Sequence, residues 1–292
     1  MSPPNPDSRT VPSLDELIAG FAKISGHAAV LSRLNEVLDD EDAGAADLIS
    51  VLRVDVGLTA RVIAAANTVY FRRGSRVASV EEAVIRVGMA QIRRLLLGSI
   101  AYELTTGPMR AYGFGPGEVW ARSLACAVAM EMLAEETQRS GDACRTIGLM
   151  HALGMIVIDR WVTQRGVRGQ ALPRPGDDAA VEQFEMGQVG VENAAVCAHL
   201  LETWKFPDAC VEAVRHQRRP LEAGVFQRLA CLLALARWQT AVVQAGHDMR
   251  RWPAVPGSDV LAGAGLSEES LKALLPMVSA EFARQKAEFG LL

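Results

Sequence analysis

The sequence predicts an all-α protein, and three observations support this expectation. Half of the 292 residues are hydrophobic but only 5% are aromatic, so the apolar side chains are mostly Ala, Leu and Val. These side chains recur at i, i+3, i+4 and i+7 along most of the chain, which is the period of a helix with one buried face. No run alternates apolar and polar residues with the period of two that marks a half-buried strand.

The first half of the chain predicts a disordered lead over residues 1–12, which contain four prolines, and then six helices. Ser13 can cap the first, over residues 13–25, with Leu17, Ile18 and Phe21 on its apolar stripe. Further helices are expected over residues 29–38, 45–54, 58–67, 79–88 and 90–104, with a loop at 68–78. Ser79 and Glu82 form a capping box, and Gly88 ends that helix.

Residues 105–117 contain two prolines and four glycines and predict a boundary between two helical subdomains. After it, helices are expected over residues 118–140, 143–165, 182–204, 207–217 and 226–245. A loop at 247–265 and a helix at 268–288 complete the chain. The expected division is an N-terminal helical subdomain at 13–105, a second at 118–245 and a C-terminal helical extension at 246–292.

A near-continuous apolar stretch, TIGLMHALGMIVIDRW at 146–161, contains one histidine. If the stretch is one helix, His151 shares a face with Ile147, Gly154, Met155 and Ile158. We therefore expect a buried imidazole that needs either a hydrogen-bonding partner or a chemical role.

Charge and cysteine content exclude several classes of function. The net charge of -4 and a pI near 5.8 give no overall attraction to nucleic acid or anionic membranes, so a nucleic-acid partner is not expected. The five cysteines lie mostly in apolar helical runs without a C-x-x-C pair, as expected of reduced core thiols. The sequence contains neither a membrane-spanning stretch nor a signal peptide, which predicts a soluble, cytoplasmic protein.

No phosphate-binding loop, dinucleotide motif, H-E-x-x-H or serine elbow is present. Five segments instead resemble, in order and spacing, the HDOD family, whose members are bacterial relatives of the HD-domain metal-dependent phosphohydrolases. The segments are DVGLTARVIAAANTVYF at 55–71, VASVEEAVIRVGMAQIRRLLL at 77–97, WARSLA at 120–125, GLMHALGMIVI at 148–158 and AHLLETWKFPDACVEAVRHQRRP at 198–220. The resemblance covers roughly residues 24–245 and implies that the second subdomain is a degenerate HD-like helical bundle.

HD hydrolases surround one or two metal ions with an early histidine, a His-Asp pair, further histidines and a late aspartate. By this resemblance, the corresponding positions here are Arg122, His151 with Ala152, Asn193 and Arg237. Only His151 and His216 remain as histidines, while Ala152 has no carboxylate and two positions carry permanent cations. The resemblance therefore implies no catalytic residue, no bound metal and no cofactor.

Three interpretations of the remaining polar residues stay open. His151 and His216 can be core histidines bonded to backbone or to a carboxylate such as Glu192 or Asp159. Alternatively Arg122 and Arg237 line the former metal pocket with the two histidines and form an anion site. Residual metal binding is the third interpretation.

Two basic clusters are candidate docking surfaces. The first comprises Arg72, Arg73 and Arg76 in a loop, and the second comprises Arg215, Arg218 and Arg219 beside His216 at a helix end. Each is either an ordinary solvated surface or a docking site for an acidic protein, a nucleotide or nucleic acid.

The function that the resemblance implies is a non-catalytic regulatory or scaffold module in bacterial signal transduction, with protein partners in networks that use cyclic dinucleotides. The alternatives are a nucleotide sensor that uses the arginine-lined pocket and a metal-dependent phosphohydrolase.

Overall fold

The computed structural model describes residues 11–25, 32–34, 36–37, 40, 43–53, 59–60, 62–63, 66–67, 77–139, 141–166, 178–246, 250 and 252–289. Within these ranges the regular structure is helical, apart from one antiparallel bridge between Met109 and Phe114. The prediction of an all-α fold is therefore confirmed. The expected disordered lead, except for its last two residues, and Arg72, Arg73 and Arg76 fall outside the described residues.

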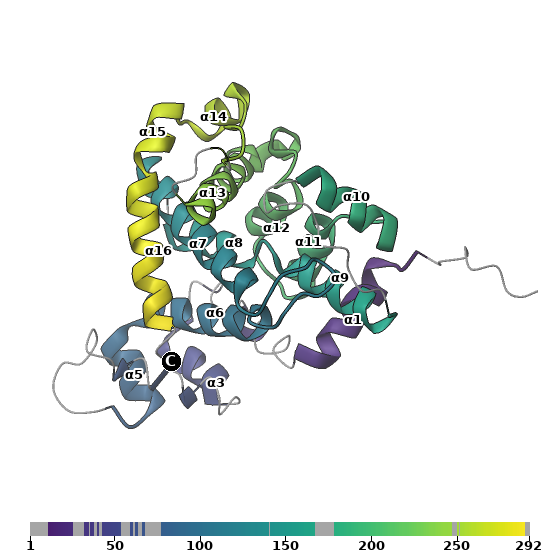
Figure 1. Cartoon of the computed structure of the whole chain (residues 1–292). Helices are drawn as coiled ribbons and strands as arrows, with labels where there is room; N and C mark the ends of the chain where they lie inside the picture. Colours follow the sequence, from purple (N-terminus) through teal and green to yellow (C-terminus); the bar gives the residue numbers. More distant parts are fainter. Residues whose placement is uncertain are drawn as a thin grey trace, which may run out of the picture.

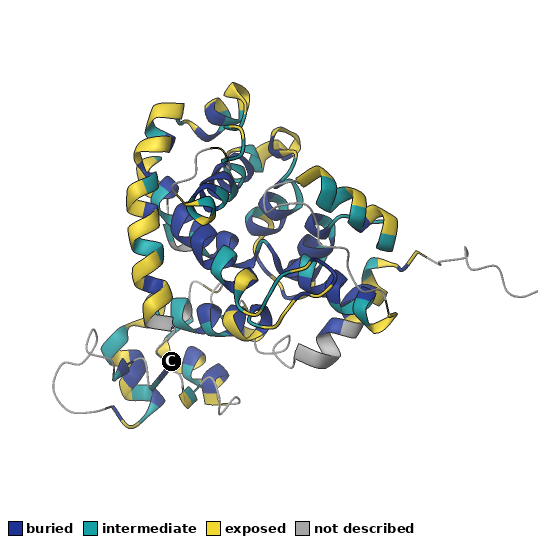
Figure 2. Ribbon diagram, in the orientation of Figure 1, coloured by how far each residue is buried: buried dark blue, intermediate teal, exposed yellow. Residues whose placement is uncertain are grey.

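Two long helices form the centre of the molecule, α7 (Glu118–Glu136) and α13 (Gln227–Ala245). Every residue of α7 from Ser123 to Met130 is buried. A helix that is buried on all sides lies inside a bundle rather than on its surface. Accordingly α8 (Gly141–Met150), α13 and α16 (Leu275–Phe289) all pack on α7, as Figures 1 and 2 show.

The N-terminal helices form two separate groups. α3 (Ala45–Arg53), α5 (Val80–Val87) and α6 (Met89–Thr105) pack in sequence order, and α6 connects them to α7 and α8. Half of the predicted capping box is present: the Glu82 amide donates to Ser79 Oγ at 3.2 Å, but the Glu82 carboxylate accepts from the Ala78 amide at 3.2 Å rather than from Ser79. Gly88 ends α5 with a φ of 87°, a left-handed conformation that glycine adopts without strain.

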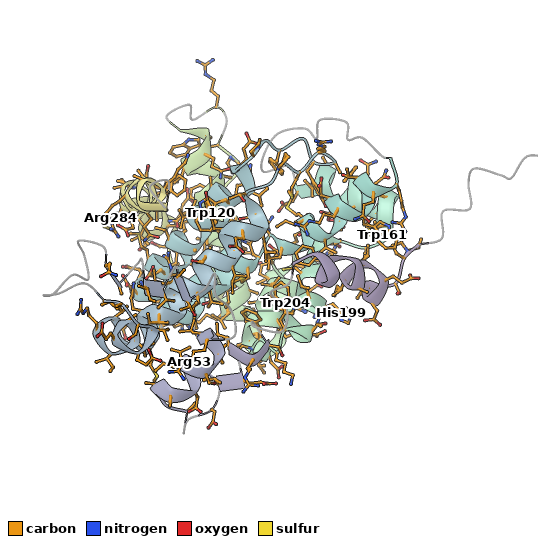
Figure 3. The ribbon with its side chains drawn as sticks, turned by 90° about the horizontal axis from the view of Figure 1, so that it is seen from below. Arg53, Trp120, Trp161, His199, Trp204 and Arg284 are labelled. Carbon is orange, nitrogen blue, oxygen red and sulfur yellow. The ribbon has the colours of Figure 1, made fainter. Side chains whose placement is uncertain are left out.

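Helix α1 (Leu14–Ser25) lies apart from the other N-terminal helices. It packs on α9 (Leu153–Gln164) and α11 (Asn193–Thr203), which belong to the second predicted subdomain. Phe21 lies 6.2 Å from Trp204 between ring centroids, and Asp15 Oδ1 lies 2.7 Å from His199 Nε2. Figure 3 shows His199 and Trp204 beside α1. An amphipathic stripe specifies that a helix has a buried face but not which neighbour covers it, so the contacts of α1 with α9 and α11 could not be read from the sequence.

Three predicted helices are interrupted, and one was missed. The 143–165 stretch divides into α8 and α9 at His151–Ala152, and the 182–204 stretch divides into α10 (Asp178–Val189) and α11. The 268–288 helix divides into α15 (Glu268–Ala273) and α16, while the expected loop at 247–265 contains α14 (Ser258–Ala264). α12 (Asp208–Arg215) agrees with its prediction. Apolar periodicity continues across these short breaks, which is why it did not reveal them.

The five cysteines are all buried and form no disulfide, as the sequence predicts. Among the described residues, none of the helices is long and apolar enough to cross a membrane.

Candidate functional site

The candidate site forms where α8 ends and α9 begins, because two glycines bring these helices into backbone contact with their neighbours. A Cβ on Gly148 would lie 2.6 Å from the carbonyl oxygen of Cys126 in α7. A Cβ on Gly154 would lie only 2.0 Å from the carbonyl oxygen of Asn193 in α11. Side chains at the α8–α9 turn are thereby held close to α7 and α11. The interpretation that His151 lies within one continuous helix is wrong, since it occupies the turn.

His151 is a half-buried, neutral imidazole. Its Nδ1 lies 2.7 Å from the Gly148 carbonyl oxygen, and because a carbonyl only accepts, Nδ1 must carry the proton. Nε2 is then an unprotonated acceptor. Burial, followed by the positive charges of Arg237 and Arg122, lowers the pKa of His151 to about 4. The predicted pair of arginines therefore does lie within electrostatic range of this histidine.

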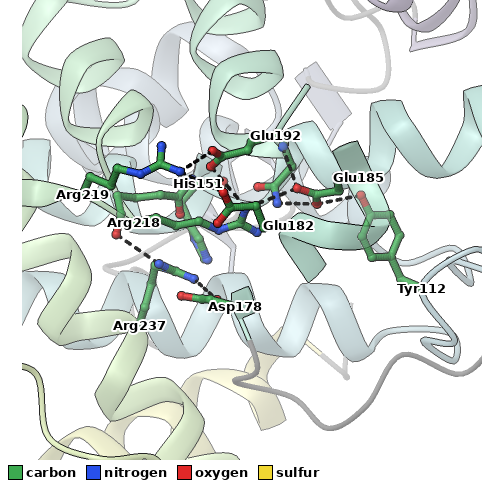
Figure 4. Close-up of polar contacts among 11 residues, drawn as sticks. Tyr112, His151, Asp178, Glu182, Glu185, Glu192, Arg218, Arg219 and Arg237 are labelled. Atoms are coloured by element: carbon green, nitrogen blue, oxygen red, sulfur yellow. Dashed lines mark hydrogen bonds and ion pairs between the residues drawn. The ribbon is translucent and has the colours of Figure 1, made fainter. Parts of the chain in front are cut away.

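Arg237, on α13, is anchored by two acceptors. Its Nη1 donates to the Gln217 carbonyl oxygen at 3.1 Å and its Nη2 donates to Asp178 Oδ1 at 2.6 Å. Burial opposes the negative charge of Asp178, but Arg237 outweighs this effect and lowers the pKa of the carboxyl. The Gln217 amide in turn donates to the His151 carbonyl oxygen at 3.3 Å. Figure 4 shows Asp178 beside Arg237, at the beginning of α10.

Arg122, on α7, has no carboxylate partner among the described residues. Its guanidinium lies over the Phe114 ring, 5.0 Å from the centroid, and burial lowers its pKa to about 10. The group stays charged at neutral pH. Arg122 and Arg237 are positively charged, His151 is neutral and Asp178 is negatively charged, while Glu118 is the carboxylate that most favours the charged form of Arg122. We call Arg122, His151, Asp178 and Arg237 the arginine cluster.

Asn193 belongs to a second, adjacent network around Glu185. This carboxylate has no solvent exposure, and it accepts from the Tyr112 hydroxyl at 2.9 Å, from the Asn193 amide at 2.9 Å and from Asn193 Nδ2 at 2.5 Å. Arg218 Nη1 lies 3.3 Å from its second oxygen. Burial raises the pKa of Glu185, and Arg218 is the largest opposing influence. Figure 4 shows this network running from Tyr112 to the arginines at the end of α12.

The second predicted docking cluster is largely neutralised by carboxylates. Arg215 pairs with Glu202 and, at 3.0 Å, with Glu212. Arg219 lies 2.8 Å from both Glu182 and Glu192. Arg218 has a side chain only 8% exposed, so it is an interior residue rather than a surface one. Whether these residues bind a partner stays a prediction.

The two predicted histidines are not brought together by any contact among the described residues. His216 caps α12, and its Nε2 lies 3.4 Å from Glu212 Oε2. The suggested partners have other roles, since Glu192 binds Arg218 and Arg219, while Asp159 accepts from the Ala111 amide at 2.7 Å.

These residues do not fit the metal centre of an HD hydrolase. Ala152 is buried at the N-cap of α9 and offers no donor atom. Arg122 and Arg237 place fixed positive charge beside His151, where a cation would be repelled. In the part of the chain that the structure describes, no three His, Cys, Asp or Glu side chains converge as metal ligands would.

The sequence alone did not single out Asp178, Gln217, Glu185 or Tyr112. Only Glu185 and Asn193 are close in sequence, eight residues apart across the α10–α11 break. The other side-chain contacts of Asp178, Gln217, Glu185 and Tyr112 join residues that are 20 to 73 positions apart in the sequence.

Comparison with known proteins identifies one family and several solved structures that share the fold of this chain. The family model described as HDOD domain matches residues 26–220. A putative signal transduction protein from Marinobacter aquaeolei VT8 has a TM-score of 0.66 and 22% identity, with 90% of this chain covered. The chain spans 58% of that protein's length.

Two other solved structures share the fold at low identity. A putative phosphohydrolase from Shewanella amazonensis SB2B has a TM-score of 0.60 and 21% identity, covering 92% of this chain and 93% of its own. An HDOD domain protein of unknown function from Geobacter sulfurreducens has a TM-score of 0.57 and 18% identity, covering 89% of both chains. No curated protein matches the chain.

Proposed function

The chain belongs to the HDOD family, and from this premise we propose that it is a non-catalytic regulatory module of bacterial signal transduction that acts by binding a protein or a small ligand. The observation that carries the proposal is the composition of the arginine cluster. Arg122 and Arg237 lie within electrostatic range of His151, at positions that the family resemblance assigns to metal ligands of the related hydrolases.

Charge is the physical reason to favour a regulatory role over hydrolysis. A hydrolytic metal needs several neutral or anionic ligands and an open position for water. Here the one carboxylate of the cluster, Asp178, is bound to Arg237 at 2.6 Å. One ring nitrogen of His151, Nδ1, donates a hydrogen bond to the Gly148 carbonyl oxygen. The Marinobacter aquaeolei relative is described as a putative signal transduction protein, which agrees with a signalling role, whereas the Shewanella amazonensis relative is described as a putative phosphohydrolase.

The proposal is tested by assaying hydrolysis of bis(4-nitrophenyl) phosphate with Mn²⁺, Fe²⁺ or Zn²⁺ present. We expect no rate above that of the same protein after heat denaturation. The His151→Ala variant is the control for a residual metal site. A metal-dependent rate that this variant abolishes would contradict the proposal.

A second candidate function, a nucleotide or other anion sensor, is favoured by Arg122. This guanidinium is half-buried, forms no ion pair among the described residues, although Glu118 acts on it electrostatically, and lies within electrostatic range of His151 and Arg237. An anionic group bound there would interact with the positive charges of Arg122 and Arg237.

The sensor is tested by thermal shift with a panel of nucleotides, cyclic dinucleotides included. A nucleotide that raises the melting temperature of the wild type should raise that of Arg122→Ala much less. Arg284→Ala, on the exposed surface of α16, is the matched control and should respond like the wild type. Equal shifts in all three proteins, or no shift in any, would count against this function.

A further inference from the structure

A small pocket lies between the 106–117 loop and α9, apart from the arginine cluster. Its volume is about 190 Å³. Since one water occupies about 30 Å³ in the liquid, the pocket has room for one small polyatomic group. Its wall consists of Pro108, Arg110, Asp159, Arg160, Thr163 and Gln164.

The wall of this pocket has one positive charge in excess. Arg110 and Arg160 both stabilise the charged form of Asp159, which places all three groups within electrostatic range. The carboxylate is already used by the fold, because Asp159 Oδ1 accepts the Ala111 amide at 2.7 Å and thereby holds the loop on α9. Two guanidinium groups therefore face one committed carboxylate.

Hydrogen-bonding capacity is also left over in this wall. Arg160 Nη1 and Thr163 Oγ1 are buried and have no hydrogen-bond partner within the described part of the chain. Leaving a buried donor unpaired costs about 1–3 kcal/mol, so folded proteins rarely keep two on neighbouring side chains. Arg160 and Thr163 are three residues apart on α9 and so share a face of that helix.

Arg160 is also held in place by an aromatic ring. Its guanidinium carbon lies 4.9 Å from the centre of the Phe21 ring on α1. Stacking on a ring face leaves the N–H groups at the edge of the guanidinium plane available as donors. Nη1 of Arg160 and Oγ1 of Thr163 are themselves covered, so an occupant of the pocket would bind them only after these two side chains rotate.

We propose that this pocket binds the phosphate group of a small ligand, with Arg110 and Arg160 supplying charge and the Thr163 hydroxyl supplying a hydrogen bond. A phosphate offers more acceptor oxygens than a carboxylate and can occupy two guanidinium groups and a hydroxyl together. The bound group would contact α9 and the 106–117 loop. Because Arg160 also stacks on Phe21, the bound group would be linked through Arg160 to α1.

The experiment is calorimetric titration of the full chain with inorganic phosphate, with acetate at matched ionic strength as the control for a general salt effect. Arg160→Gln and the isosteric Thr163→Val remove the two unpaired groups. Arg165→Gln is the matched control, because Arg165 lies at the end of the same helix but is exposed, with its guanidinium over Trp161 at 3.3 Å. Arg122→Gln removes the other candidate anion site.

We expect phosphate to bind the wild type, Arg165→Gln and Arg122→Gln alike and acetate not to bind. Loss of one charge-assisted contact should weaken phosphate binding by about tenfold or more in Arg160→Gln, and loss of the hydroxyl should weaken it by a smaller factor in Thr163→Val. Thr163→Val, which keeps its shape, separates loss of binding from loss of folding. No binding, equal binding by Arg160→Gln and the wild type, or loss only in Arg122→Gln would overturn the proposal, and the last result would leave the anion sensor intact.

Discussion

Replacing Gly154 by alanine tests whether the contact between α9 and α11 positions the site. The added Cβ would lie 2.0 Å from the Asn193 carbonyl oxygen and 2.8 Å from the Cys197 amide nitrogen. Both atoms belong to the backbone, so the helices must move apart by about 1.4 Å or more to reach ordinary contact, which begins at 3.4 Å. Overpacking of this kind costs about 1–3 kcal/mol of stability. Because backbone atoms cannot rotate away as side chains can, we expect the packing cost of Gly154→Ala to be about 3 kcal/mol or more.

The net effect on the free energy of unfolding includes a gain from helix propensity. Alanine is favoured over glycine inside a helix by about 1 kcal/mol, so we expect Gly154→Ala to lower the stability by about 2 kcal/mol or more. For a chain of this size that is a fall of about 4 °C or more in melting temperature.

Gly187→Ala is the matched control for this prediction. Gly187 also lies in a helix, α10, but a Cβ there would meet nothing within 4 Å. We expect this variant to keep or gain stability, by up to about 1 kcal/mol. The two melting curves, followed by far-ultraviolet circular dichroism, give the comparison. Equal melting temperatures for the two variants would refute the inferred close contact between α9 and α11.

The remaining predictions concern charge. The pKa of His151 is lowered from 6.5 to about 4 in the folded chain, so the unfolded chain binds the proton more readily between these two pH values. The free energy of unfolding therefore falls as the pH is lowered from 6.5 to 4, by at most about 3 kcal/mol. An NMR titration that finds His151 protonated at pH 6 would disprove this, and His151→Gln should lose less stability over the same interval. Glu185→Ala leaves the Tyr112 hydroxyl and Asn193 buried without their acceptor and leaves Arg218 with Glu192 alone, so it should cost about 3 kcal/mol or more in urea unfolding. Glu182→Ala, which removes only a partner of the exposed Arg219, should cost less than about 1 kcal/mol. Equal losses of stability in Glu185→Ala and Glu182→Ala would contradict the burial of the network around Glu185.

The elements that the sequence predicts best are those whose signals are local. The Ser79 side-chain cap on the Glu82 amide and the Gly88 terminus both depend on residues a few positions apart, and both are present. The break at His151–Ala152 has no such signal, because apolar residues at helical spacing continue on both sides of it. The α10–α11 break does coincide with a glycine, Gly190, at a φ of 71°, but a single glycine inside an apolar stretch does not distinguish a turn from a close helix contact.

The candidate site was foreseen in part. The positions of Arg122, His151 and Arg237 come from the family resemblance, and in the structure their charges affect one another. Asp178, which binds Arg237 from 59 residues away, could not be found by reading along the chain. A pairing of this kind depends on how α10 packs over the bundle, and periodicity carries no information about that contact.

Metal analysis of the protein purified without a chelator tests the central claim most directly. That claim is that two arginine cations and a carboxylate already bound to Arg237 leave no place for a metal beside His151. We expect iron, manganese and zinc at far below one ion per chain, with no increase after incubation with each metal and gel filtration. One ion per chain that is lost in His151→Ala would contradict the claim.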